Sequence, residues 1–237
     1  AGDINPAFGD LDADGDLDLL AGNNYPSYFS EPGELNFFEN QGDSMIPAFG
    51  PSMQNPYGLT VNLSINQPAP TLIDIDADGD LDTVLGYRYY YIGKSLRSFI
   101  QFRENTGDPQ TPDFYYTTGP GNDLSGLDVY DYDAKPTFVD IDNDGDLDAF
   151  VGTYHRGYYP EYTKAAKTGA YTSELKFFRN TGSATDPQFV QDDARLLGLQ
   201  RYFLSYTVNP SFIDIDCDGD LDAYLGLDYN FGVYINT

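Results

Sequence analysis

The sequence predicts an all-β fold, and three observations support this. An acidic nonapeptide occurs four times, at 10–18, 74–82, 140–148 and 214–222. Its flanks are short apolar, β-prone runs, such as PTFVD before the third copy and LDAFVG after it, and Gly or Pro residues separate these runs. No segment keeps a sustained helical period. We therefore expect short strands joined by turns throughout the 237 residues.

Each nonapeptide is one part of a longer repeat. Successive copies begin 64, 66 and 74 residues apart. In each repeat a Pro precedes the first strand, a Gly ends the second, a Tyr-rich connection follows, and a third strand ends in Asn, as in FFENQG at 37–42. A further apolar segment, such as LTVNLSI at 59–65, leads to the next copy. About four short strands in a repeat of this length is typical of a β-propeller blade, whereas a solenoid would repeat its motif every nine residues.

We therefore predict a single β-propeller domain of four blades, each with about four antiparallel strands. The repeat units are 6–69, 70–135, 136–209 and 210–237 within the domain 1–237, and residues 1–5 complete the last unit. The two ends, read together as YINTAGDINPAF, resemble FRENTGDPQTPDF at 102–114, which favours a closed ring of four blades. Four units of a longer array is the open alternative. The junction is short, so we expect an incomplete fourth blade whose strand edge can pair with another chain.

The nonapeptide has the ligand pattern of a calcium loop. In the third copy Asp140, Asp142 and Asp144 alternate, Gly at position 6 allows a sharp turn, and Asp148 closes the set at position 9. Position 7 commonly binds through its carbonyl, so we expect the side chain of Asp146 to face water. At ~4 Å and an effective dielectric of ~20, two like charges repel by roughly 4 kcal/mol, which a divalent cation offsets. Oxygen ligands without His or Cys favour calcium over zinc or copper.

Four calcium sites are predicted in this way, one in each repeat. A solvated acidic turn is the alternative for a single copy, but four near-identical copies with Gly at position 6 argue against it. An EF-hand is excluded, because position 12 lacks the required Glu in every copy. The predicted ligands are Asp10, Asp12, Asp14, Asp16, Asp18, Asp74, Asp76, Asp78, Asp80, Asp82, Asp140, Asp142, Asp144, Asp146, Asp148, Asp214, Asp216, Asp218, Asp220 and Asp222. Of these, Asp16, Asp80, Asp146 and Asp220 are expected to bind through the backbone carbonyl.

The motif D-x-D-x-D-G-x-x-D, with its strand flanks, resembles the FG-GAP or VCBS-type repeats of integrin α-subunit propellers and of many bacterial surface proteins. The resemblance covers the whole chain in four units. It implies a β-propeller with calcium between the first two strands of each blade, held by the aspartates at positions 1, 3, 5 and 9. The number of motifs departs from the family pattern, because integrin-type propellers have seven blades.

Charge and cysteine content limit the partners and the compartment. The formal net charge is −26, and four divalent cations, each adding two charges, would change it only to −18. A molecule this acidic is a poor partner for nucleic acid or anionic membranes. The one cysteine, Cys217, is a small filler at position 4 and allows no disulfide within the chain. The sequence shows no signal peptide and no membrane-spanning apolar run, and weak oxygen sites suit the millimolar calcium outside cells, so we expect a secreted or cell-surface protein.

The sequence favours a non-enzymatic role. The single histidine, His155, has no evident Ser or Cys partner, and metal binding accounts for the paired aspartates. Exposed tyrosines are good contacts for proteins and sugar rings. We therefore expect a structural or adhesion module that binds proteins or copies of itself, with a carbohydrate-binding propeller as the alternative. Tyrosines from the connections after the calcium strands are the candidate partner-binding residues: Tyr25, Tyr28, Tyr89, Tyr91, Tyr154, Tyr158, Tyr159 and Tyr229.

Overall fold

The computed structural model describes residues 4–23, 33–60, 65–89, 97–114, 131–155, 172–192, 205–228 and 231–236, with the short stretches 124, 126–127, 129, 198–199 and 202–203. These residues form an all-β structure without an α-helix, as the sequence predicted. The one helical turn among them is the 3-10 turn η1 (Pro56–Gly58). No helix in the described part of the chain has the length and apolar character needed to cross a membrane.

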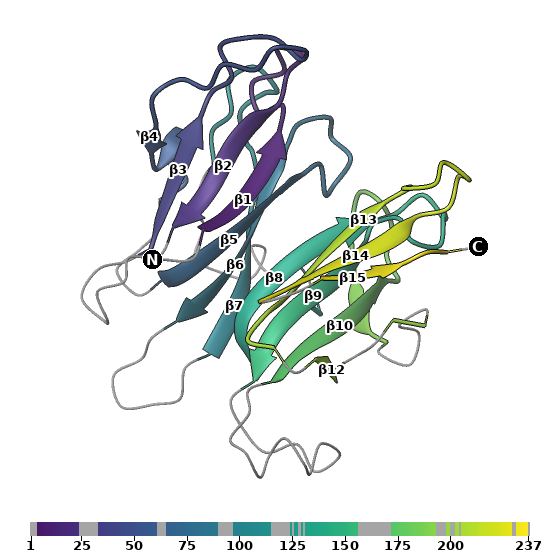
Figure 1. The fold of residues 1–237 in the computed structure, drawn as a ribbon. Coiled ribbons are helices and arrows are strands. Elements are labelled where there is room, and N and C mark those ends of the chain that lie inside the picture. The colour runs from purple at the N-terminus through teal and green to yellow at the C-terminus, as the bar shows by residue number, and fades with distance from the viewer. Residues whose placement is uncertain are drawn as a thin grey trace.

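The strands form four antiparallel sheets (Figure 1). The first sheet contains β1 (Ile4–Gly9), β2 (Asp18–Asn23), β3 (Glu34–Phe38) and β4 (Met53–Gln54) in that order. The second contains β5 (Ile65–Ile73), β6 (Asp82–Tyr89) and β7 (Arg97–Arg103). The third contains β8 (Tyr132–Val139), β9 (Asp148–His155), β10 (Thr172–Asn180) and β11 (Phe189–Gln191), and β12 (Tyr202–Phe203) also pairs with β10. The fourth contains β13 (Val208–Ile213), β14 (Asp222–Leu227) and β15 (Phe231–Tyr234).

Each acidic nonapeptide joins the first two strands of one sheet, as the flanking apolar runs predicted. The aspartate at position 9 opens the second strand and pairs with the last residue of the first strand. The four pairs are Gly9 with Asp18, Ile73 with Asp82, Val139 with Asp148, and Ile213 with Asp222. Ile4 and Asn5, which the repeat boundaries assigned to the fourth unit, lie in β1 of the first sheet.

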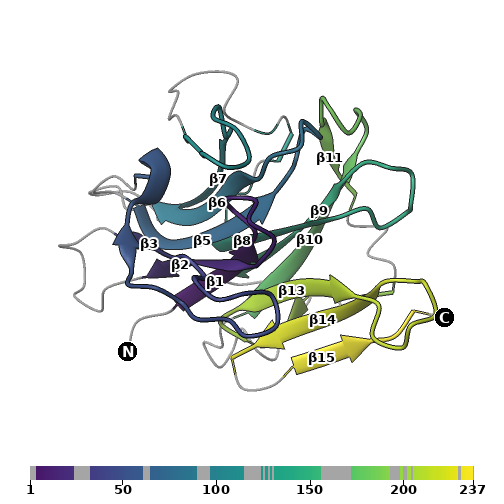
Figure 2. The same cartoon turned by 90° about the horizontal axis from the view of Figure 1, so that it is seen from above.

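The sheets pack against one another in the order of the sequence. β1 and β2 contact β5, β5 and β6 contact β8, and β8 and β9 contact β13. Seen from above, the first strands of the four sheets lie toward the middle, and β3, β7 and β15 lie farther out (Figure 2). Three clusters of buried apolar side chains form the core. Each cluster joins neighbouring sheets, so the core is built from one inter-sheet contact repeated along the chain.

The glycine that follows each aspartate loop lets the next sheet approach closely. A Cβ atom at Gly22 would lie 1.9 Å from the carbonyl oxygen of Pro68. The corresponding distance is 2.2 Å from Gly86 to Ala134 and 1.8 Å from Gly152 to Val208. At Gly226 in the fourth sheet, the nearest described atoms belong to Asn209 of the same sheet, at 3.6 Å and beyond. The close contact therefore occurs three times, and the described residues provide no fourth.

A side-chain hydrogen bond accompanies this contact between later sheets. The hydroxyl of Thr71 in β5 donates to the carbonyl of Pro136 in β8 at 2.8 Å. The hydroxyl of Thr137 in β8 donates to the carbonyl of Pro210 in β13 at the same distance. Each threonine follows the repeat proline of its own strand, so in the second and third repeats one short polar side chain ties the first strand to that of the next sheet.

Candidate metal centres

The backbone of every nonapeptide is wrapped around its first aspartate. The two carboxylate oxygens at position 1 accept the backbone N–H groups of positions 5 and 6 at 3.0–3.1 Å in all four loops. The aspartate at position 5 accepts the N–H group of position 7 at 3.0–3.2 Å. Gly at position 6 has φ between 94° and 100°, a conformation that side chains rarely adopt. The four loops therefore share one local structure.

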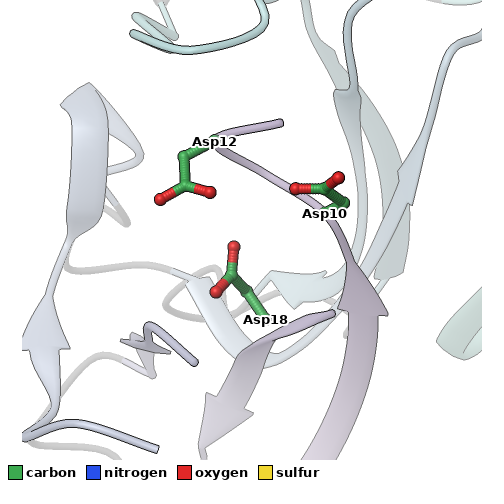
Figure 3. A group of neighbouring side chains, drawn as sticks. All are labelled: Asp10, Asp12 and Asp18. Atoms are coloured by element: carbon green, nitrogen blue, oxygen red, sulfur yellow. The ribbon is translucent and has the colours of Figure 1, made fainter. Parts of the chain in front are cut away.

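This structure brings three carboxylates together in each loop. Positions 1 and 3 contribute in all four copies, and their oxygens lie within 4.8 Å of those of a third aspartate. In the first loop the third member is Asp18, and Figure 3 shows the carboxylates of Asp10, Asp12 and Asp18 around a common space. In the other three loops the third member is the aspartate at position 5. All four predicted centres therefore contain a group of oxygens that could hold a cation.

The aspartate at position 9 lies beneath each loop and is buried in all four sheets. One of its oxygens accepts the backbone N–H of the asparagine that follows the third strand or ends it, at 2.7–2.8 Å. In three loops the other oxygen accepts the N–H of position 2, at 2.9–3.4 Å. The position-9 side chain therefore fastens the loop to the third strand, in addition to any part it has in binding a cation.

The expectation that position-7 side chains face water is wrong for the first two loops. Asp16 and Asp80 are buried, Asp146 is half-buried, and only Asp220 is exposed. The cause is the asparagine from the third strand, whose side chain interacts with the position-7 carboxylate in the first three loops. Contact across the sheet, which the spacing of a nonapeptide cannot show, draws these carboxylates inward.

Several buried carboxylate oxygens have no hydrogen-bond donor among the described residues. In the aspartate loops they belong to Asp12, Asp16, Asp76 and Asp80 in the first two loops, and to Asp146 and Asp148 in the third. A buried anionic oxygen without a donor is costly, and a hard cation can satisfy it. The oxygen-only donor set and these unsatisfied atoms fit a calcium ion.

Burial makes the charged forms of Asp80 and of three position-9 aspartates unfavourable. It raises the pKa of Asp18 and Asp148 to about 6 and that of Asp82 to about 8. Burial is also the main cause of the raised pKa of Asp80, about 6, to which the nearby charge of Asp78 contributes. A carboxylate loses its hydration when buried, and a bound cation would compensate for that loss.

The recurring asparagines were visible in the sequence only as strand ends, yet they organise the next loop. The side-chain oxygen of Asn180 accepts the N–H groups of Gly182 and Gln188, at 3.0 and 2.9 Å. Asn40 and Asn105 accept the equivalent pairs at 2.8–3.1 Å. The sequence signal for these asparagines is the motif N-x-G, which occurs at the end of the third strand in the first three repeats.

We expect Asn180→Ala to lower the free energy of unfolding by about 1–3 kcal/mol, because it leaves two backbone N–H groups without their acceptor. Urea unfolding monitored by tyrosine fluorescence measures this loss. The matched control is Asn143→Ala at position 4, where φ is 59° and where alanine occupies the first two loops at φ 54° and 58°. Equal stability losses in the two variants would contradict the role of Asn180.

Of the remaining residues singled out in the sequence, the structure describes the side chains of Tyr154 and Cys217. Tyr154 is half-buried with its ring beside those of Tyr132 and Tyr206, so it packs between the third sheet and the segment that precedes β13. Cys217 is exposed, and its φ of 62° matches the conformation of position 4 in the other loops. Tyr25, Tyr28, Tyr91, Tyr158, Tyr159 and Tyr229 lie outside the described residues, as do the side chains of Tyr89 and His155.

Together, the fold and the loops define an all-β repeat protein with four aspartate centres that could hold metal ions. No protein-family model and no curated protein matches this chain. Its assignment therefore rests on the repeat itself, on the four sheets and on the geometry of the loops.

Proposed function

We propose that the chain is a calcium-stabilised β-propeller that acts as a non-enzymatic structural or adhesion module on the cell exterior, where it binds other proteins or copies of itself. The observation that carries the proposal is the convergence of three carboxylates in each of four loops. The buried oxygens without donors in the first two loops support calcium as the occupant.

The order of the sheets supports the propeller. Each sheet presents its first strand to the first strand of the next, and the glycine contact repeats between sheets one and two, two and three, and three and four. Antiparallel sheets of three to five strands that pack face to face in sequence order are the blades from which propellers are built. In this proposal each aspartate loop fixes one end of its blade.

Charge and calcium supply support the cell exterior. With a formal net charge of −26, the chain gains most from cations where calcium is millimolar. A protein or a second copy is favoured over a glycan, because the exposed apolar side chains described below lie on sheet faces. Most of the tyrosines that suggested sugar binding lie outside the described residues.

Isothermal titration with calcium, after removal of bound metal, tests the proposal. We expect four sites in the wild-type chain and three in Asp76→Asn, which alters a candidate ligand of the second loop that has one buried oxygen. Asp113→Asn is the matched control, because Asp113 is exposed and lies outside the nonapeptides. The proposal fails if millimolar calcium does not bind, or if Asp76→Asn retains four sites.

A further inference from the structure

The outer faces of the first and fourth sheets are exposed where the equivalent faces of the inner sheets are buried. Two residues after position 9, Leu20, Val84 and Phe150 have no exposed surface. Tyr224 occupies the same place in the fourth sheet and is 36% exposed. A large apolar or aromatic side chain occupies this place in all four repeats, and among the described residues no further sheet covers Tyr224.

The third strand of the fourth sheet extends this exposed face. Phe231 pairs with Gly226, as Leu175 pairs with Gly152 in the third sheet, and it is 63% exposed whereas Leu175 is fully buried. Val233 pairs with Tyr224, and it is exposed although its equivalent Phe177 is buried. We call Tyr224, Phe231, Val233 and Ile213 the forward face of the fourth sheet.

The first sheet exposes the opposite half of the same contact. Ile4 is 67% exposed, whereas the residues at its place in β8 and β13, Ala134 and Val208, are buried. Phe8 is 56% exposed, although Phe138 at its place in β8 is buried. We call Ile4, Pro6 and Phe8 the rear face of the first sheet.

The backbone and polar groups of this contact have no counterpart from another sheet among the described residues. A Cβ at Gly152 would meet the carbonyl of Val208, whereas a Cβ at Gly226 meets no atom of another sheet. Ile4 occupies in β1 the position that Val208 occupies in β13. Ser211 occupies the place of Thr71 and Thr137, whose hydroxyls reach the repeat proline of the next sheet. It is exposed and has no hydrogen-bond partner among the described residues. Its matching acceptor would be the carbonyl of Pro6.

We propose that the forward face of one copy receives the rear face of a second copy, so that chains associate head to tail. A second copy is the expected partner, because each of the three contacts between sheets inside the chain already joins a forward face of this kind to a rear face of this kind. Such a contact is heterologous, so it leaves one free face at each end and generates a closed ring or an open array. The inference deepens the proposed function by naming the partner and the surface that binds it.

Calcium should control this association. Two chains of formal charge −26 repel each other, and four divalent cations per chain lower that charge to −18. The loop between β13 and β14 also holds the ends of these strands, which carry Ile213 and Tyr224 of the forward face and Ser211, the residue paired with Tyr224. We therefore expect head-to-tail association in millimolar calcium and dissociation in EGTA.

The sharpest experiment mixes two chains that each have one damaged face. Phe8→Asp damages the rear face and Tyr224→Asp damages the forward face, so each variant alone should remain monomeric in calcium. An equimolar mixture should form a one-to-one dimer and nothing larger, because one intact pair of faces remains. Sedimentation velocity measures the masses, and Ile46→Asp, an exposed residue on neither face, is the control that should assemble like the wild type.

A second variant separates assembly from folding. Gly226→Val places a side chain whose Cβ makes only ordinary van der Waals contact with Asn209 in the single chain, but it blocks the strand that would approach from a second copy. We expect an unchanged midpoint of thermal unfolding at monomeric concentrations and association weakened by at least about tenfold.

Three results would overturn the inference. They are a wild-type chain that stays monomeric at high concentration in calcium, a mixture that stays monomeric, and a monomeric wild type in which Gly226→Val lowers the unfolding midpoint. The last would indicate closure within one chain. Calcium titration of the same samples keeps the two proposals distinguishable, because a monomer with four calcium sites contradicts the association and leaves the calcium module intact.

Discussion

Removal of calcium with excess EGTA is expected to lower the midpoint of thermal unfolding by more than about 20 °C. A ligand present at about 100 times its dissociation constant stabilises the folded state by ~2.7 kcal/mol per site, and four sites act together. The physical reason is the set of buried aspartates at position 9, together with the buried oxygens at positions 3 and 7 of the first two loops, whose charges repel one another and lack hydration in the folded chain. Circular dichroism with temperature, in 2 mM calcium and in EGTA, measures the shift.

Magnesium serves as the control for calcium removal. It demands a smaller octahedral site and gives up its waters reluctantly, so magnesium at equal concentration should restore little of the lost stability. Asp76→Asn should lose part of the calcium-dependent shift, and Asp113→Asn should keep all of it. An unfolding midpoint that is the same in calcium and in EGTA would show that the loops fold without metal.

Gly152→Ala is expected to be the most damaging single substitution between sheets, with a loss of at least about 3 kcal/mol in the free energy of unfolding. The new Cβ atom would lie 1.8 Å from the carbonyl oxygen of Val208 and 2.8 Å from its carbonyl carbon. Both atoms belong to the backbone of β13, so the fourth sheet would have to move away from the third. That movement would also open the ring contact between Phe150 and Phe212, now 4.5 Å apart.

The same substitution in the fourth sheet is the matched control. Gly226→Ala meets only atoms of Asn209, at 3.6 and 3.7 Å, which is ordinary van der Waals contact. Both variants should be measured in the Phe8→Asp background, which removes the proposed association. Urea unfolding should then show a loss for Gly152→Ala and a change within about 0.5 kcal/mol for Gly226→Ala. Equal losses would mean that glycine is required by the strand itself and not by the neighbouring sheet.

The sequence by itself determined the all-β class and the internal structure of the aspartate loops. The predicted arrangement of alternating aspartates around a turning glycine is local, because the groups that meet lie within nine residues of one another. The flanking runs predicted a strand on each side of every loop, and the register of β8 with β9 confirms it for Asp140–Asp148. This local geometry depends on residues that are neighbours along the chain, so it can be predicted from the sequence.

Only the tertiary structure decided what each repeated residue contacts. Asp148 receives the N–H of Asn180 from 32 residues away, and the burial of Asp16 and Asp80 depends on the same strand pairing. Phe150 and Tyr224 occupy one place in the repeat, yet one is buried and the other exposed. Burial of such a residue depends on whether another sheet packs on it, as β13 and β14 do on the side of Phe150, and a repeated motif is the same with or without that neighbour. The physical reason is that packing is a property of surfaces brought together from distant parts of the chain.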